Sequence, residues 1–192
     1  MNFIFDVGNV LVEFKPLVYL KSLFTDNTLV EKIHATIFKS PQWLYMDLGI
    51  MTHSEAIEFY SAREPEFESA IYHTMKSVND MFIPLPDTIK LLPALKDAGH
   101  DLYYLSNIHK EIRDFLLSNH EYFKLFDGGV FSCDISAAKP SPETYRHLIE
   151  KYRLVPGDSI FFDDVQENVS AAEKEGLKGV LFTTADCVMR YL

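Results

Sequence analysis

The chain has 192 residues, which is enough for one full domain or for a domain with a large insertion. Apolar residues make up 47% of the sequence, so a sizeable core is available. Acidic residues outnumber basic ones, 28 to 18, and the formal net charge is -10. This balance argues against nucleic acid as a partner, because binding to phosphates needs clustered Lys and Arg. An anionic substrate would need a local positive site against the overall field.

The cellular setting is predicted from cysteine usage and from the absence of targeting signals. Two cysteines, Cys133 and Cys187, are too few for a disulfide framework and favour a reduced, intracellular environment. The N-terminus lacks the basic and long apolar regions of a signal peptide. No apolar stretch approaches the roughly 20 residues that cross a bilayer. We therefore expect a cytoplasmic protein with no membrane partner; the sequence leaves the oligomeric state open.

The first predicted element is a short strand, Phe3–Asp6, which is apolar up to its closing aspartate. Residues 15–81 then offer helix signals and no convincing strand. Asp26 precedes an apolar repeat at helical spacing, and Thr52–Glu55 has the pattern of a capping box. Residues 69–77 form a further candidate helix. The sequence therefore predicts a helical insertion directly after the first strand.

Strands and helices alternate in the rest of the chain. Thr88–Ala98 is predicted to be helical, and Pro93 must either start a second helical segment there or kink the first. The remaining predicted helices begin at Ser141 and cover Val165–Glu175, and the remaining predicted strands are Asp101–Ser106, Gly129–Cys133, Ser159–Asp163 and Gly179–Thr183. Such alternation predicts a doubly wound α/β domain with a parallel sheet. We assign residues 1–14 and 82–192 to this core domain and residues 15–81 to a separate helical domain.

Polar side chains occur where four of these strands end or just beyond. They are Asp6, Ser106, Asn107, Lys139, Asp163 and Asp164. The carboxyl ends of parallel strands meet at one edge of a sheet, so we expect these residues to form one cluster. Each of them alone has an ordinary structural explanation, such as a turn or a helix cap. Their joint placement at strand ends is what points to a functional site.

This cluster has the composition of a site for magnesium and phosphate. Carboxylate oxygens are hard ligands that suit Mg²⁺, which commonly shares its site with a substrate phosphate. Lys139 can bind a phosphate oxygen, and Ser106 and Asn107 can donate hydrogen bonds to others. Asp6 can attack phosphorus to form an aspartyl-phosphate that water later hydrolyses. Positioning and charge stabilisation carry most of such a reaction.

Four segments resemble, in order, the four motifs of the haloacid dehalogenase-like (HAD) hydrolase superfamily. They are Asp6–Leu11, Leu105–Asn107, Lys139–Pro140 and Phe162–Asp164. The first and last look most like those of bacterial sugar-phosphate phosphatases of the glucose-1-phosphate phosphatase type. The resemblance implies a Rossmann-like core, and the helical insertion is similar to the α-helical cap domain of these enzymes.

The resemblance also implies roles for individual residues around a Mg²⁺ ion. Asp6 would be both the nucleophile and a metal ligand, and the carbonyl of Gly8 would be a second ligand. Asp164 would be the main ligand from the last motif, with Asp163 assisting.

On the phosphate side, the resemblance implies that Ser106 and Lys139 hold the substrate, with Asn107 beside it. Lys139 then counts with Asp6 as a catalytic residue. The implied activity is hydrolysis of a small phosphorylated metabolite, with a sugar phosphate expected.

One departure from the family pattern is Gly8, because most phosphatases of this superfamily place a second Asp there as general acid and base. Such help is typically worth ~10²–10⁴-fold, so its loss need not abolish the reaction. Asp47 or His53 could substitute, although a surface or capping role is the ordinary explanation for each. The histidines show no paired metal spacing, and His109 alone lies near a motif.

Two alternatives to the phosphatase remain open at this point. One is a metal-independent 2-haloacid dehalogenase with Asp6 as nucleophile; these enzymes also lack the second Asp. The other is a non-catalytic protein that binds a phosphorylated ligand, since Gly8 provides no acid or base.

Overall fold

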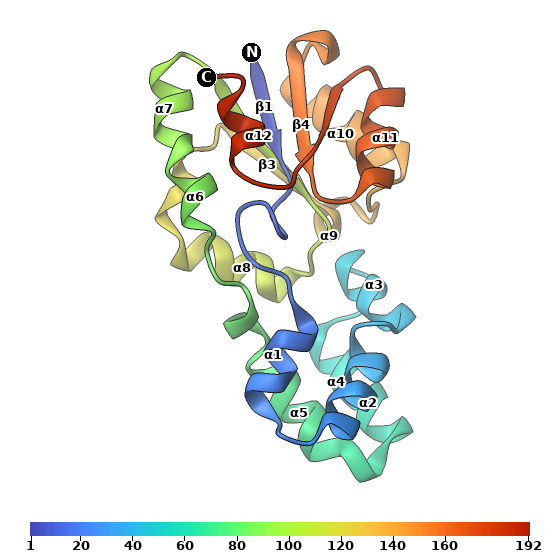
Figure 1. Cartoon of the computed structure of the whole chain (residues 1–192). Coiled ribbons are helices and arrows are strands. Elements are labelled where there is room, and N and C mark those ends of the chain that lie inside the picture. Colours follow the sequence, from blue (N-terminus) through green and yellow to red (C-terminus); the bar gives the residue numbers. More distant parts are fainter.

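A five-stranded parallel sheet forms the centre of one lobe of the molecule (Figure 1). The structure is a computed structural model that describes residues 1–192. The strands are β1 (Asn2–Phe5), β2 (Asp101–Ser106), β3 (Gly128–Phe131), β4 (Ser159–Asp163) and β5 (Lys178–Leu181). They lie in the order β3-β2-β1-β4-β5, and every neighbouring pair is parallel. The predicted doubly wound sheet is confirmed, and its strand order reverses at β1, where such folds bind ligands.

Helices cover both faces of this sheet because alternate strand residues point to opposite sides. The helices of this lobe are α6 (Pro86–Ile89), α7 (Leu91–Asp97), α8 (Lys110–Asn119), α9 (Ser132–Ile135), α10 (Pro142–Tyr152), α11 (Gln166–Lys174) and α12 (Asp186–Met189). Phe3, Phe5 and Phe162 belong to the apolar cluster that includes α7, α8 and α12. Ile4 and Phe161 pack instead with α10 and α11. All five side chains are fully buried, which explains why β1 and β4 carry apolar residues on both faces of the sheet.

A break between α6 and α7 decides between the two alternatives predicted for Pro93, a second helical segment or a kink. The helix predicted over residues 88–98 is two segments, and Pro93 is the third residue of α7. A proline in the first turn of a helix costs no intrahelical hydrogen bond, since the N–H groups there have no partner.

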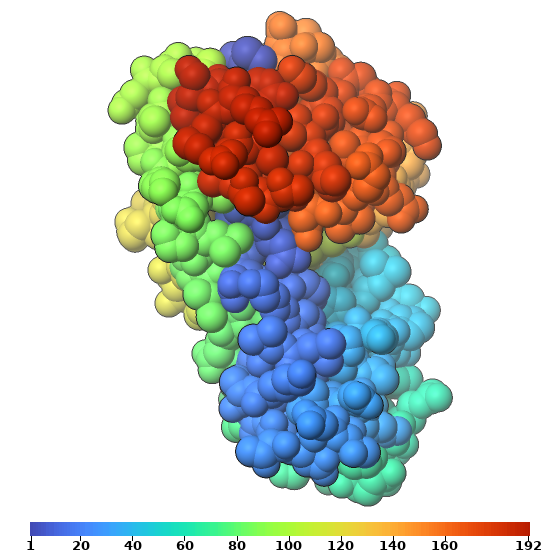
Figure 2. All heavy atoms as spheres, in the orientation of Figure 1, coloured from blue at the N-terminus to red at the C-terminus, as the bar shows by residue number.

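The chain between β1 and α6 is helical and forms a second lobe (Figures 1 and 2). Its helices are α1 (Pro16–Leu23), α2 (Asn27–Ile37), α3 (Pro41–Asp47), α4 (His53–Arg63) and α5 (Glu68–Lys76). Asp26 caps α2 by accepting from the N–H of Thr28 at 2.8 Å. Thr52 and Glu55 form the capping box of α4 that the sequence predicts. None of these helices, nor any other in the chain, has the length and apolar character to span a membrane.

Two segments that run side by side join the lobes. The N–H of Glu13 donates to the carbonyl of Ile83 at 2.7 Å, and the N–H of Leu85 donates to the carbonyl of Leu11 at 2.8 Å. One apolar cluster of 33 buried residues extends from the sheet into the helical lobe, where it includes Ile33. The helical lobe is therefore packed against the sheet lobe as well as tethered to it.

Candidate active site

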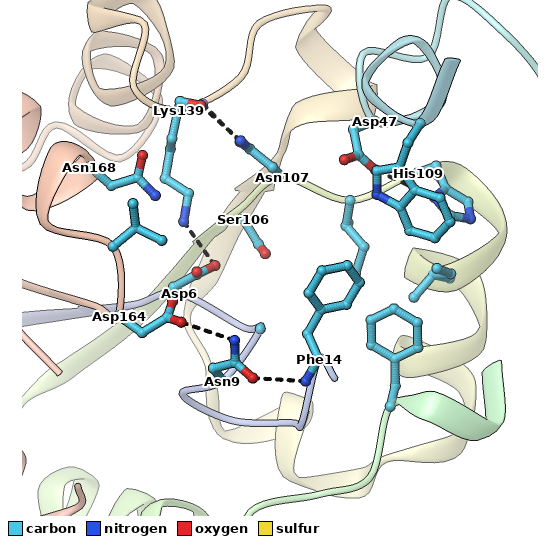
Figure 3. A pocket seen from close by; sticks show the side chains of 16 residues that line it. Asp6, Asn9, Phe14, Asp47, Ser106, Asn107, His109, Lys139, Asp164 and Asn168 are labelled. Carbon is cyan, nitrogen blue, oxygen red and sulfur yellow. Dashed lines mark hydrogen bonds and ion pairs between the residues drawn. The ribbon is translucent and has the colours of Figure 1, made fainter. Parts of the chain in front are cut away.

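A cavity of about 290 Å³ lies at the carboxyl ends of the strands, beside the helical lobe (Figure 3). The residues that the sequence places at strand ends converge on it. Those that line it are Asp6, Gly8, Ser106, Asn107, Lys139 and Asp164. Asp163 is the one predicted site residue that does not line the cavity, because its side chain is fully buried behind it.

The Lys139 ammonium lies at the centre of this cluster. Its Nζ is 2.8 Å from Oδ1 of Asp6 and 2.6 Å from Oδ2 of Asp163, and its side chain is only 2% exposed. Burial would lower the pKa of Lys139, but the two carboxylates outweigh it and raise that pKa above its usual value. Burial raises the pKa of Asp6 to about 6, and Asp163 adds to the rise while Lys139 opposes it. The Lys139 ammonium thus forms ion pairs with two buried carboxylates.

Asp163 is held by partners on every side. Its carboxylate accepts from Nδ2 of Asn168 at 3.0 and 3.1 Å and from the N–H of Val165 at 2.8 Å. Asn168 is in turn fixed by Tyr145, whose hydroxyl donates to its carbonyl at 2.9 Å. Because these contacts and Lys139 occupy both oxygens, Asp163 acts here as a support for the lysine. The sequence allowed Asn168 either a role in steadying the loop after β4 or an ordinary place on a helix, since an Asn on a helix face has no distinctive pattern; its bonds to Asp163 favour the first.

Asn107 supports the same lysine through the backbone. Its Oδ1 accepts from the N–H of Lys139 at 2.8 Å, and its Nδ2 donates to the Lys139 carbonyl at 2.9 Å. These two bonds fasten the loop between α9 and α10 to the end of β2. Asn107 lines the cavity, as expected for a residue beside the substrate, but its main contacts position Lys139.

Asn9 shapes the turn after β1. Its backbone is left-handed, with φ 54°, a conformation that Asn tolerates better than most residues. Its Nδ2 donates to Oδ2 of Asp164 at 2.9 Å, and its Oδ1 accepts from the N–H of Phe14 at 2.9 Å. Asn9 therefore orients Asp164 and closes the turn. The sequence reasoning missed this role; the Gly-Asn pair directly after a strand was the available signal.

The acidic residues fit a divalent cation. Carboxylate oxygens of Asp6, Asp163 and Asp164 all lie within 4.8 Å of one another. Three carboxylates face one lysine, so the cluster carries an excess of negative charge. Burial raises the pKa of Asp164, which shows the cost of keeping it charged there. With Asp163 bound to other groups, Asp6 and Asp164 are the side chains available to a hard cation such as Mg²⁺.

The opposite wall of the cavity is mostly apolar. Its apolar residues are Phe14, Trp43, Phe82, Ile108 and Ile112. Asp47, at the end of α3, and His109, before α8, are the ionisable residues on this wall, and they pair at 3.4 Å. Burial raises the pKa of Asp47, although His109 opposes the rise.

The fold and the acidic, lysine-centred site together define a Rossmann-like hydrolase with an aspartate at the end of its first strand. The chain belongs to the haloacid dehalogenase-like hydrolase family, whose model matches residues 1–176. The predicted family is thereby confirmed.

Relatives include named phosphatases. The chain is 28% identical to the sesquiterpene phosphatase astK of Aspergillus oryzae over 180 residues, which covers 94% of this chain and 88% of that protein. It is 24% identical to a phosphorylated carbohydrates phosphatase of Thermotoga maritima over 182 residues, which covers 92% and 82%. A HAD-family enzyme of Bacteroides thetaiotaomicron, solved with magnesium and inorganic phosphate, has a TM-score of 0.74 at 19% identity, covering 95% and 94%. A hydrolase is thus shown; the glucose-1-phosphate phosphatase subtype stays a prediction.

The buried lysine gives a stability prediction. Lys139→Met should lower the free energy of unfolding by about 3–5 kcal/mol at pH 7, since it leaves Asp6 and Asp163 buried without a cation. Urea unfolding measures this loss. Lys90→Met is the matched control, because the Lys90 pair with Asp87 is exposed and its loss should change stability little. Equal, small effects of both variants would contradict the proposed role of Lys139.

Proposed function

We propose that this protein is a Mg²⁺-dependent phosphatase that hydrolyses a small phosphate monoester through an aspartyl-phosphate on Asp6. The observation that carries the proposal is the placement of the Asp6 carboxylate beside Lys139 and Asp164 in one cavity. The relatives named as phosphatases support the same reaction class.

The residues of the chain have clear tasks in such a reaction. Lys139 and the Ser106 hydroxyl bind oxygens of the phosphate and orient phosphorus toward Asp6. A carboxylate oxygen of Asp6 forms the bond to phosphorus as the bond to the leaving alcohol oxygen breaks. Water then attacks phosphorus, releases phosphate and restores the carboxylate. Mg²⁺, held by Asp6, Asp164 and the Gly8 carbonyl, would neutralise the charge of the phosphate.

The helical lobe, residues 15–81, would act as the cap of this active site. Trp43 and Asp47, both from α3, line the cavity that also holds Asp6. Covering the site in this way excludes water and strengthens the electrostatic contacts inside it. Opening would then be needed for substrate entry and product release.

The leaving group faces the apolar wall in this proposal. A sugar would need several hydrogen-bonding partners there, yet Asp47 and His109 already bond to one another. Phe14, Trp43 and Phe82 instead offer aromatic surface. We therefore favour the phosphate ester of an apolar alcohol over the sugar phosphate expected from the sequence. The printed name of the Aspergillus oryzae relative, a sesquiterpene phosphatase, agrees with this choice.

The reaction class is tested by phosphate release with and without Mg²⁺. We expect release from aryl and alkyl phosphates that stops on chelation and returns with Mg²⁺. Asp6→Asn should remove the activity by at least ~10³-fold, because the amide cannot attack phosphorus. Halide release from 2-haloacids that is unaffected by chelator would instead favour the dehalogenase.

The leaving group is tested with a panel of esters. The kcat/KM for prenyl phosphates should exceed that for sugar phosphates. Trp43→Ala should lower it by about 10–200-fold for prenyl phosphates, as expected for lost apolar contact, while activity on acetyl phosphate changes little. A preference for sugar phosphates that survives Trp43→Ala would refute the assignment of the apolar wall.

Gly8 provides the test for a non-catalytic protein. A Cβ at Gly8 would lie 3.6 Å from Cβ of Phe14, an ordinary contact, so a side chain can begin there without a clash at its first atom. Gly8→Asp should raise kcat up to ~10²-fold by supplying the missing acid and base. Gly8→Asn, of equal size but unable to transfer a proton, is the control. Activity that appears only in Gly8→Asp, with none in the unaltered protein, would favour the binding protein.

A further inference from the structure

Three side chains that can bind a metal meet where the helical lobe contacts the sheet lobe. His53 is the first residue of α4, His109 directly precedes α8, and Glu111 lies in the first turn of α8. Their nitrogen and carboxylate ligand atoms lie within 4.8 Å of one another. The two imidazole rings have centroids 5.8 Å apart. None of these residues belongs to the acidic cluster around Lys139.

Each histidine has one buried nitrogen without a partner. These are Nδ1 of His53 and Nε2 of His109, and the His109 side chain is only 1% exposed. A buried polar atom that lacks a hydrogen bond is destabilising, so two such atoms on neighbouring rings require an explanation. A single cation bound by both nitrogens would give each of them a partner.

The other nitrogen of each ring has an acceptor. His53 Nε2 lies 3.0 Å from the Met75 carbonyl, and His109 Nδ1 lies 3.4 Å from Oδ1 of Asp47 (Figure 3 shows Asp47 and His109). If each of these nitrogens carries the hydrogen, the free lone pairs belong to the two unpartnered nitrogens. A hydrogen bond from the outer nitrogen to a carboxylate or carbonyl is the usual support of a metal-bound histidine.

The kinds of ligand and their exposure suit a metal as well. Glu111 is exposed, which leaves a side of the cluster open to solvent and to a water ligand. Two imidazoles and a carboxylate are the ligand set of many zinc sites, and nitrogen ligands disfavour Mg²⁺.

We propose that His53, His109 and Glu111 form a second cation site, for a transition metal of the Zn²⁺ type, that ties the helical lobe to the sheet lobe. His53 comes from the helical lobe, whereas the other two come from the sheet lobe. A bound ion therefore resists any separation of the lobes. If the proposed phosphatase cycle requires that separation, Zn²⁺ at this site slows turnover.

Cobalt(II) titration with excess Mg²⁺ present tests the site directly. Co²⁺ bound by histidines in a four-coordinate site absorbs visible light strongly, whereas Co²⁺ bound by oxygens at the acidic cluster absorbs weakly. We expect a strong band at one equivalent that Zn²⁺ displaces. His53→Gln should abolish it, Glu111→Gln should weaken Co²⁺ binding at least tenfold, and His147→Gln, an exposed histidine on α10, should leave it unchanged.

Thermal unfolding provides a second readout that does not depend on activity. Zn²⁺ should raise the Tm of the unaltered protein and of His147→Gln by several degrees, but not that of His53→Gln. A strong cobalt band that persists in His53→Gln, or a Tm that Zn²⁺ does not raise, would overturn the proposal. If Zn²⁺ inhibits phosphate release and His53→Gln relieves the inhibition, the bound ion slows turnover by holding the lobes together. If an active enzyme shows no such inhibition, the metal site stands but its effect on turnover is refuted.

Discussion

The buried ammonium of Lys139 is the interaction on which this site depends. It lies between Asp6, after β1, and Asp163, at the end of β4, so it joins segments far apart in the chain. A charge buried this deeply is tolerated only when its partners are in place. Asn107 holds the backbone of Lys139, and Asn168 holds the carboxylate of Asp163. The same contacts that stabilise the fold therefore set the distances between the reacting groups.

Much of the fold could be predicted from local patterns in the sequence. Each of the five predicted strands exists. The central strands β1 and β4 are buried on both faces and so leave a short apolar run in the sequence, whereas the edge strand β5 is only partly buried. Strand ends converge in any parallel sheet, so Asp6 and Lys139 could be placed together in advance. The different roles of Asp163 and Asp164 could be expected only from the family resemblance, since the local pattern does not say which of two neighbouring carboxylates faces the cavity. The apolar wall of the cavity could not be predicted either, because residues such as Trp43 are equally typical of a hydrophobic core.

Separation in sequence explains what was missed at the lobe contact. His53 and His109 are 56 positions apart by number, and only the packing of α4 near the start of α8 brings their rings together. Spacing rules find ligands on one helix or loop, not ligands contributed by two lobes.

The two proposed cation sites also differ in chemistry. Oxygens of Asp6 and Asp164 suit a hard ion, while imidazole nitrogens suit a softer one.

The central position of β1 has a consequence for biosynthesis. Its neighbours are β2 and β4, so Phe3 aligns with Leu102 and with Ile160. On the ribosome, β1 emerges first but cannot complete its pairing until almost the entire polypeptide has been translated. Helices α1 to α5 need only nearby residues and can form earlier. Phe3 and Phe5 therefore lack one of their two flanking strands until late in translation, a state in which an apolar strand is prone to aggregation.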